Sequence, residues 1–343
     1  MTVEEALETV GRDREARALI IAALRDFERL PGRRFTAVRD EITGPLVDAL
    51  HARAGVVRKE LRDGLVFEFL YRSKIARDFV MAVPDAPDHV WEPQTTKLLV
   101  HLSRGGGDAI VGGAYFGDHA VPIAAALRGR GTCHAFEPDP EQAAMLARNA
   151  ALNGLDNLFA HAFGLWSEAG VRLRFVGRDA LASTTPGEDG VPATTIDDHV
   201  AASRIERVGL IMLDLEGAEL EVLRGARRVL AGQAPHLVFE IHRTYVDWSG
   251  GLERTDIVRF LATFGYTVFA VRDFQSNVDL GDRPVELVPI DTVWLGGPPH
   301  GFNLLAVRDP SVVEDARFRI VPGVSPKLLF HRDPRLHHPE GGL

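Results

Sequence analysis

Two glycines and a later glutamate are the first residues whose types and spacing could do chemistry. Gly113 and Gly117 fall in an expected turn between a strand and a helix, where glycine lets the backbone pass close to a ligand. Glu137 follows twenty residues after Gly117, at the expected end of the next strand. A carboxylate placed there can accept hydrogen bonds from both hydroxyls of a ribose. The three residues indicate a nucleoside-bearing cofactor, against the alternative of an ordinary turn beside a solvated glutamate.

The spacing of the glycines separates two classes of nucleoside cofactor. Dinucleotide-binding turns carry the pattern Gly-x-Gly-x-x-Gly and hold a pyrophosphate at the start of the following helix. Here the glycines are four residues apart, and the helix expected from Asp118 offers free N–H groups. This spacing suits a small amino-acid moiety lying across the loop better than a pyrophosphate. It therefore favours S-adenosylmethionine over a nicotinamide dinucleotide.

Three acids follow a later apolar run. Asp214 ends that run, Glu216 lies in the turn after it, and Glu219 falls on the helix expected next. Like charges held together raise one another's pKa, so such a group is costly unless it binds something. Glu216 and Glu219 can also serve the positive end of the helix, which an anion stabilises by about 0.3–1 kcal/mol. Asp214 is the stronger candidate for chemistry, with Glu216 as a second.

Another expected strand ends with a carboxylate and an imidazole on one face. Glu240 and His242 are two residues apart, so both side chains lie on the same side of the strand. If this strand neighbours the one that ends at Asp214, the three side chains could converge. They would form either a site for Mg²⁺ or Mn²⁺, or a general base with the group that orients it, which makes Asp214 and His242 catalytic candidates. The alternative is a core glutamate paired with an arginine.

The elements that must position these residues begin near residue 95. Before it, segments 4–29 and 47–62 carry apolar residues at helical spacing. After it, short β-branched runs alternate with helical stretches, which predicts a mostly parallel sheet with helices on both faces. The expected strands are 109–112, 132–136, 158–165, 208–214, 236–242, 266–271 and 303–308, and the expected helices are 117–128, 141–153, 217–231 and 256–264.

This pattern divides the chain into three parts. They are a helical N-terminal region at 1–95 that acts as a cap or in oligomerisation, a cofactor-binding domain at 96–309, and a tail at 310–343. Segments 176–192 and 273–285 are expected to be loops on the substrate side. The tail holds His331, His337 and His338, which we interpret as surface histidines.

The composition bounds the partners. The 343 residues are 45% hydrophobic and 25% charged, as in an ordinary globular protein, and the net charge of −9 disfavours nucleic acid and anionic membranes. Cys133 is the single cysteine, which excludes an intramolecular disulfide and a thiolate-rich zinc site. The acidic N-terminus is unlike a signal peptide, and no apolar stretch approaches the roughly 20 residues of a membrane helix. We expect a cytoplasmic protein with a small-molecule substrate, and a homodimer is a candidate assembly.

Taken in their order and spacing, these motifs make the chain similar to the FkbM family of S-adenosylmethionine-dependent methyltransferases. The resemblance runs from about Trp91 to Arg308. It rests on Trp91-Glu92-Pro93, Gly113-Ala114-x-x-Gly117, Phe136-Glu137-Pro138, Thr195-Ile196-Asp197-Asp198, the run from Asp214 to Ala226, and Val238-Phe239-Glu240-Ile241-His242. It implies a Rossmann-like class I methyltransferase fold, an α/β fold whose seven strands take the order 3-2-1-4-5-7-6 with the seventh antiparallel. It also implies O-methylation of a sugar or a secondary metabolite.

The resemblance further implies which residues hold the cofactor. They are Glu92, Gly113, Ala114, Tyr115, Gly117, Asp118, Glu137, Pro138 and Gly164. The chain departs from the family at Val111, where an Asp that helps to hold the methionine part is usual, and at Tyr115, where Asn is usual. Met212 stands where the family often has Lys. Glu92 or Asp118 could take over the role of the missing Asp.

The activity expected from these residues is transfer of a methyl group from S-adenosylmethionine to a hydroxyl of a small polar substrate, a sugar or a glycosylated metabolite. Two other classes stay open. One is a nicotinamide-dependent oxidoreductase, which the glycine spacing disfavours. The other is a catalytically silent protein that keeps the fold for binding, which Val111 favours.

Overall fold

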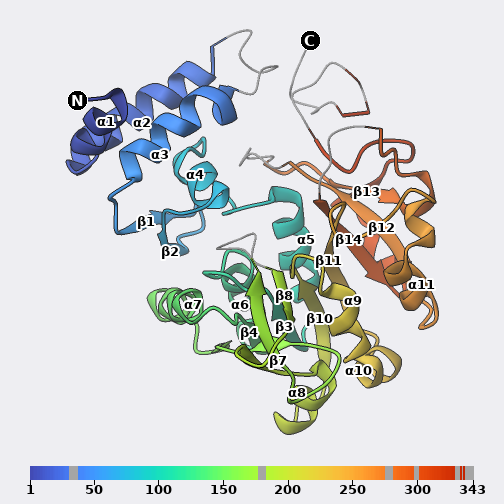
Figure 1. Ribbon diagram of the computed structural model, residues 1–343. Helices are drawn as coiled ribbons and strands as arrows, with labels where there is room; N and C mark the ends of the chain where they lie inside the picture. The colour runs from blue at the N-terminus through green and yellow to red at the C-terminus, as the bar shows by residue number, and fades with distance from the viewer. Residues whose placement is uncertain are drawn as a thin grey trace.

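The computed structural model describes residues 1–30, 38–176, 183–274, 281–296, 301–328, 333 and 335–336. The three histidines predicted to lie on the surface of the tail, His331, His337 and His338, fall outside these residues. One large sheet with helices on both sides forms most of the molecule, and the N-terminal helices lie beside it (Figure 1).

The central sheet has nine strands in the order β15-β13-β12-β14-β11-β10-β3-β4-β5. Seven of them, β3, β4, β5, β10, β11, β12 and β14, take the order 3-2-1-4-5-7-6 when numbered along the chain, and β14 runs antiparallel to both of its neighbours. The predicted class I methyltransferase order is therefore confirmed. The strands are β3 (Asp108–Gly112), β4 (Cys133–Phe136), β5 (Leu158–His161), β10 (Val208–Leu213), β11 (His236–His242), β12 (Thr267–Arg272) and β14 (Gly301–Val307).

Side chains that alternate along the inner strands supply a core on each face of the sheet. Leu210 and Met212 of β10 pack in one hydrophobic cluster, and Ile211 and Leu213 pack in the other. Because successive residues of a strand point to opposite faces, this arrangement requires helices on both sides. The helices of the first face are α5 (Pro93–Ser103), α6 (Ala120–Leu127) and α7 (Pro140–Leu152); those of the second are α8 (Ile196–Ala202), α9 (Glu219–Arg224), α10 (Arg227–Gly232) and α11 (Asp256–Ala262).

Two further strands extend the sheet beyond the seven that were predicted. β13 (Val285–Pro289) pairs antiparallel with β12, and β15 (Phe318–Ile320) pairs parallel with β13. The segment after residue 310 is therefore part of the sheet edge rather than only a loop. Phe318 is buried in the core, which explains why so short a strand is held there.

The N-terminal region is not wholly helical, contrary to the prediction. Its helices are α1 (Val3–Val10), α2 (Arg14–Glu28), α3 (Gly44–His51) and α4 (Lys74–Val80), and they are accompanied by a hairpin of β1 (Val56–Glu60) and β2 (Val66–Leu70). The predicted helix at 47–62 ends at His51, because Gly55 and the β-branched pair Val56 and Val57 favour a strand. Asn149 of α7 fixes the hairpin by accepting the N–H of Glu68 and donating to its carbonyl oxygen, both at 2.8 Å.

A second sheet covers the carboxyl edge of the first. It has four strands in the order β6-β9-β7-β8. They are β6 (Gly164–Leu165), β7 (Arg172–Val176), β8 (Ser183–Pro186) and β9 (Val191–Thr194). We predicted that segment 176–192 is a loop, but its described part contains strands. The prediction was wrong because Gly, Pro and Ser are more typical of loops than of strands.

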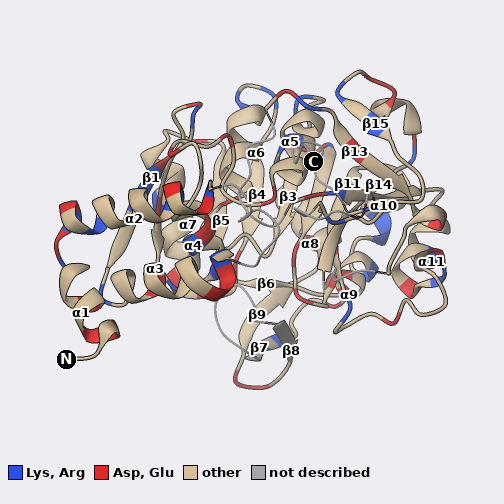
Figure 2. Cartoon of the chain, turned by 90° about the horizontal axis from the view of Figure 1, so that it is seen from above, with Lys and Arg blue, Asp and Glu red and all other residues tan. Residues whose placement is uncertain are grey.

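Charged side chains of both signs are interspersed over the outer helices and loops (Figure 2). Strand β10 carries no charged residue, and its neighbour β3 carries one, Asp108. Among the described helices, none is long and apolar enough to cross a membrane.

Candidate functional site

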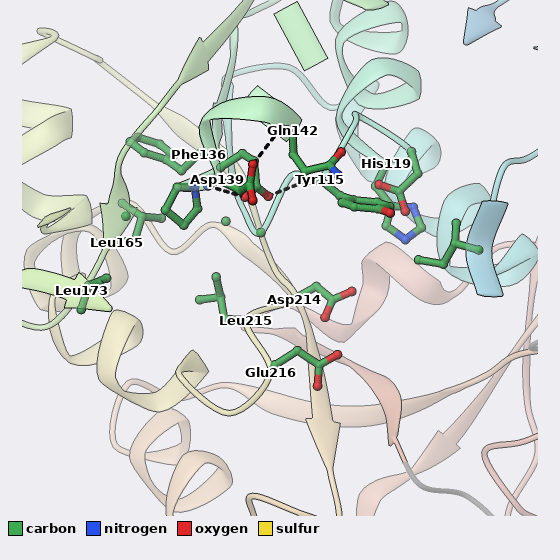
Figure 3. Close-up of a pocket in the computed structure, with 17 residues that line it drawn as sticks. Tyr115, His119, Phe136, Asp139, Gln142, Leu165, Leu173, Asp214, Leu215 and Glu216 are labelled. Atoms are coloured by element: carbon green, nitrogen blue, oxygen red, sulfur yellow. Dashed lines mark hydrogen bonds between the residues drawn. The ribbon is translucent and has the colours of Figure 1, made fainter. Parts of the chain in front are cut away.

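A pocket lies at the carboxyl ends of β3, β4 and β10, which is the edge where open parallel sheets bind ligands (Figure 3). It encloses about 890 Å³, including its open mouth. Ile75 of α4 and Leu165 and Leu173 of the smaller sheet supply apolar walls. Of the sequence-predicted site residues, those that line it are Gly113, Tyr115, Asp118, Glu137, Pro138, Gly164, Asp214 and Glu216.

Glu137 follows β4 directly and is 8% exposed. Its Oε2 accepts the N–H of Tyr115 at 2.8 Å, and its Oε1 accepts the N–H of Asp139 at 2.9 Å. Burial raises the pKa of Glu137 to about 7, against the effect of these two hydrogen bonds. Each carboxylate oxygen has a second acceptor site, so the side chain is held in place and can still accept two hydroxyl groups.

The N–H groups of the glycine turn are already bonded within the protein. Gly113 and Ala114 donate to the carbonyl oxygen of Phe136 at 3.0 and 3.1 Å, and Tyr115 donates to Glu137. The carboxylate of Asp118 accepts from the N–H groups that precede α6. The free N–H groups expected at Asp118 are therefore occupied, and the turn does not offer the cradle that a pyrophosphate uses.

The protein's own packing requires both glycines of the turn. Gly113 has a φ of +74°, and a Cβ there would lie 1.8 Å from the carbonyl oxygen of Asp214. Gly117 has a φ of +101°, and its Cβ would lie 2.9 Å from side-chain atoms of Val121 and Leu146. From the sequence, we explained these glycines by the close approach of a cofactor. That explanation is incomplete, because packing within the protein also requires them. Gly113 also joins the ends of β3 and β10 by direct backbone contact.

Three residues at this edge of the sheet have left-handed backbone without being glycine. Their φ values are 48° for Glu92, 45° for Tyr115 and 50° for Glu216. Such a conformation costs roughly 1–3 kcal/mol per residue and concentrates at ligand sites, where the surrounding structure imposes it. Asn, the usual residue of the family at position 115, tolerates this conformation better than Tyr.

His119 is a buried cation at the pocket wall. Burial opposes its charged form, but the carboxylates of Asp118 and Glu92 raise the pKa of His119 to about 9. Its Nε2 lies 3.6 Å from Oε2 of Glu92, which also accepts a hydrogen bond from Asn303 at 2.6 Å. Glu92 is not among the described residues that line the pocket, whereas His119, which it contacts, is. Asp118 lines the pocket and is therefore the better placed substitute for the acid missing at Val111.

Asp214, Glu216 and Glu240 form an acidic cluster at the ends of β10 and β11. One carboxylate oxygen from each lies within 4.8 Å of the others. Burial and the charges of Glu92 and Glu216 raise the pKa of Asp214 well above its ordinary value. Burial and the charge of Asp214 do the same to the pKa of Glu240. A carboxyl group with a raised pKa holds its proton more tightly than an ordinary carboxyl group does.

Glu219 differs from the other acids of its run. Its carboxylate accepts the N–H of Leu215 at 2.8 Å and that of Gly217 at 3.1 Å. Burial raises the pKa of Glu219 to about 7. The side chain thus satisfies backbone groups at the start of α9, which agrees with the role expected from the sequence. Glu216 instead faces the pocket (Figure 3).

The sequence of the domain around this pocket matches one protein family. Residues 112–268 match the methyltransferase FkbM domain. This segment is an FkbM methyltransferase domain. None of the curated proteins matches the chain.

Solved structures from several organisms are similar to the chain, and most of those compared are described as methyltransferases or methylases. The methyltransferase FkbM from Methylobacillus flagellatus KT is 16% identical over 59% of this chain, with a TM-score of 0.36, and the chain covers 43% of its length. The cofactor-bound Rv0187 from MTB is 13% identical over 63% of this chain and 80% of its own, with a TM-score of 0.37. The SAM-dependent O-methyltransferase from Thermotoga maritima is 13% identical over 76% of this chain and 81% of its own, with a TM-score of 0.34.

Within the FkbM domain, Glu240 and His242 both lie over Gly301, but the predicted metal-ligand set of Asp214, Glu240 and His242 is not among the groups of described residues whose ligand atoms lie within 4.8 Å of one another. Nδ1 of His242 accepts the N–H of Thr244 at 3.0 Å, and its ring packs on that of Tyr245. Glu216 takes the third place in the acidic cluster. The parity argument that paired Glu240 with His242 was sound for the strand, but His242 is its last residue, and the turn after it holds the ring.

Sequence reasoning missed two buried charges beside this cluster. Asp273, 2% exposed, follows β12 and accepts the N–H groups of Gln94 and Thr95 at 3.0 and 2.7 Å, so it caps α5. Lys327, 3% exposed, lies in the tail; burial lowers its pKa, while the charges of Glu92 and Glu240 act in the opposite direction. Asp273 could have been predicted as a site residue, because it is an acid that directly follows a strand. Nothing local marks Lys327.

Proposed function

We propose that the protein is an S-adenosylmethionine-dependent O-methyltransferase that acts on a hydroxyl of a small polar substrate, a sugar or a glycosylated secondary metabolite. One observation carries this proposal. The charged residues of the pocket wall are Asp118, His119, Glu137, Asp139, Asp214 and Glu216, so among the described lining residues no Lys or Arg faces the pocket. S-adenosylmethionine carries a net positive charge, which this wall attracts, whereas a dinucleotide pyrophosphate would be repelled.

The residues present fit this cofactor. Glu137 would accept the ribose hydroxyls with the acceptor sites that its two backbone hydrogen bonds leave unused. Asp118 would hold the ammonium group of the methionine part. Pro138, Gly164 and Leu165 supply the apolar wall beside Glu137, where the adenine would lie. When bound, S-adenosylmethionine supplies a methyl group already activated by its sulfonium.

The remaining task of the protein is to position and deprotonate the acceptor hydroxyl. Asp214 lines the pocket, and its raised pKa makes its carboxylate a stronger base than an ordinary aspartate. Glu216 lies beside it in the pocket wall and would accept a second hydroxyl of the acceptor, which favours a polyhydroxylated substrate. Holding both groups in line with the methyl carbon accounts for much of the rate in such a displacement.

A divalent metal at Asp214, Glu216 and Glu240 is the alternative way to activate the hydroxyl. We favour the base, because buried His119, whose pKa is raised to about 9, already offsets part of the charge of the surrounding carboxylates. The raised pKa values of the cluster also mean that protons compete with a metal for these oxygens.

Calorimetric titration with S-adenosylhomocysteine and with NADH tests the proposal. We expect S-adenosylhomocysteine alone to bind, and mass spectrometry of a panel of sugars and glycosides incubated with S-adenosylmethionine to reveal a mass gain of one methyl group. Binding of NADH would support the oxidoreductase. Binding of neither would support a silent protein, the reading that the buried, apolar Val111 favours.

A further inference from the structure

Three histidines from three separate elements meet on the face of the sheet that α8 covers. His134 lies in β4, His161 ends β5 and His199 lies in α8. Nδ1 of His134 is 3.4 Å from Nε2 of His161 and 3.2 Å from Nε2 of His199. One nitrogen of each ring lies within 4.8 Å of the other two. None of these residues takes part in the methyl-transfer site described above.

These separations match the coordination of a metal ion. Nitrogen ligands of zinc lie about 2.0–2.1 Å from the ion, so two of them in a tetrahedral site are about 3.3–3.4 Å apart. The two nitrogen–nitrogen distances in the protein, 3.4 and 3.2 Å, agree with the distance expected in such a site. Imidazole binds metals as the neutral form, and burial lowers the pKa of His161 and His199 to about 4. Both rings are therefore neutral at physiological pH.

Hydrogen bonding among the rings leaves the cluster incompletely satisfied. The single lone pair on Nδ1 of His134 can accept one good hydrogen bond, yet two ring nitrogens approach it. If one ring N–H takes that lone pair, the remaining ring nitrogen has only a longer contact, such as that of Nε2 of His199 with Oγ of Ser203 at 3.5 Å. A cation at the centre would satisfy all three lone pairs at once.

The surroundings resemble those of metal-bound histidines. Oδ2 of Asp108 lies 3.6 Å from Nε2 of His134, in the position of the carboxylate that commonly orients a metal ligand. The ring of Phe136 packs on His161 and His199, with centroids 4.7 and 4.8 Å apart, and excludes water on the inner side. Ser203, which is exposed, places its Oγ 3.5 Å from Nε2 of His199, so an ion could enter from this side and keep a water as fourth ligand.

We propose that His134, His161 and His199 bind one divalent transition-metal ion, zinc by the chemistry of its donors, at a site separate from the methyl-transfer pocket. Three imidazoles without a thiolate or carboxylate ligand suit zinc, copper or nickel and not magnesium or calcium. The ion would tie β4 and β5 to α8. Its site lies behind Phe136, which lines the pocket and precedes Glu137, so the ion would brace the strand end that carries the ribose-binding carboxylate.

Zinc titration of the full chain without an affinity tag tests the site. We expect one Zn²⁺ per chain by calorimetry, Co²⁺ to give the visible spectrum of a four-coordinate site, and zinc at about a hundredfold excess over Kd to raise the Tm by about 4 °C. His161→Gln and His199→Gln should each weaken zinc binding at least about tenfold and remove the Tm shift. Circular dichroism checks that both variants fold.

Matched variants separate this site from other histidines and from the acidic cluster. His236→Gln changes a half-buried histidine of β11 outside the cluster, and Glu216→Gln changes the other metal-compatible group; both should bind zinc as the unaltered chain does. Asp108→Asn should lower zinc affinity by about 10–100-fold, as expected for a carboxylate that orients a ligand. A chain that takes up no zinc, a His199→Gln variant that binds it as tightly, or a loss of binding in Glu216→Gln would each overturn the proposal.

Discussion

Carboxylates are held in opposite ways at the two ends of the pocket. At the end of β4, Glu137 accepts two backbone N–H groups at 2.8 and 2.9 Å, so donors that cannot move fix its position. At the ends of β10 and β11, Asp214, Glu216 and Glu240 face one another within 4.8 Å, and Oε2 of Glu240 is buried without a hydrogen-bond partner among the described residues. Burial and mutual repulsion raise the pKa values of Asp214 and Glu240.

In the proposed mechanism, this difference separates cofactor binding from proton transfer. A carboxylate fixed by backbone donors keeps its geometry and serves as an acceptor for a ligand. Carboxylates that raise one another's pKa are poised to exchange a proton. Gly113 connects the two ends, because its N–H bonds to the carbonyl oxygen of Phe136 before Glu137, while its Cα lies against the carbonyl oxygen of Asp214.

Replacing Gly113 should distort the pocket both at Glu137 and at Asp214. We therefore expect it to have the largest effect on stability and on cofactor binding. In Gly113→Val the new Cβ would lie 1.8 Å from a backbone oxygen, at a φ of +74° that a β-branched residue does not adopt. We expect a loss of more than about 4 kcal/mol, seen as a fall in Tm of more than about 5 °C and loss of S-adenosylhomocysteine binding. In Gly117→Ala the Cβ meets only side-chain methyl groups, and the fall should be smaller. A Gly113→Val protein with unchanged Tm and no binding would instead show that the glycine serves the cofactor alone.

Asp214→Asn should disable the proton-transfer end and leave the binding end intact. Removal of a general base typically lowers kcat by about 10²–10⁴-fold, while S-adenosylhomocysteine affinity should stay close to that of the unaltered protein. Glu221→Gln, which alters an acid of α9 that pairs with Arg224, is the matched control and should change neither quantity. Parallel loss of activity and affinity in Asp214→Asn would remove the distinction between the two ends.

Glu137 gives the converse test. Hydrogen bonds to a charged group contribute about 1.5–3 kcal/mol, so Glu137→Ala should weaken S-adenosylhomocysteine binding by about 10–150-fold. Because that variant leaves the N–H groups of Tyr115 and Asp139 unpaired, Glu137→Gln, which keeps an acceptor oxygen, guards against a loss of stability. If calorimetry gives the same affinity for both variants and for the unaltered chain, Glu137 does not bind the ribose hydroxyls of the cofactor.

The pKa of Glu137 predicts a pH dependence of binding. Its value of about 7 in the free protein means that the carboxylate forms as the pH rises from 6 to 8. Hydroxyl donors bind the ionised form better, so S-adenosylhomocysteine affinity should rise about tenfold over this interval. His119, with a pKa of about 9, stays charged throughout and contributes little to the change. Glu137→Gln should give a flat profile, and a profile that keeps its slope would assign the titration to another group.

The positions of the inner strands were predictable from the sequence because these strands obey simple rules, whereas their order in the sheet was implied by the resemblance to the FkbM family. In β10, residues of alternating parity serve the two cores, and Asp214 follows as the first charged residue at the carboxyl end. The hairpin of β1 and β2 was missed since the preceding apolar residues also fit a helix. Strand β15 was missed because three residues carry no periodicity, and only pairing with β13 defines it.

Only those residues of the candidate site that belong to a local sequence motif could be predicted. The turn at Gly113, the acid at Glu137 and the acid at Asp214 each lie next to a strand end and line the pocket. His134, His161 and His199 share no motif, and only the register of β4 with β5 and the packing of α8 bring them together. Lys327 reaches the acidic cluster through backbone hydrogen bonds that join the tail to Asp273, a contact that no local pattern encodes.

Chelation should have the smallest effect on turnover, and it sharpens the comparison by asking whether the acidic end exchanges protons or holds a metal. If Asp214 is a base, excess EDTA leaves the rate close to its original value when the assay runs well below the Tm. The chelator should still lower the Tm, because it removes the ion proposed at His134, His161 and His199.

The two readouts distinguish the two groups of metal-compatible residues. A fall in Tm without a fall in rate assigns the bound ion to the histidines and leaves Asp214, Glu216 and Glu240 as proton carriers. A loss of turnover that Mg²⁺ restores, and that zinc does not, would place a metal at the acidic cluster, because oxygen ligands prefer hard cations. Glu216→Gln would then weaken the response to Mg²⁺, whereas His199→Gln would not. The same chelator titration therefore tests the role of each end against the other.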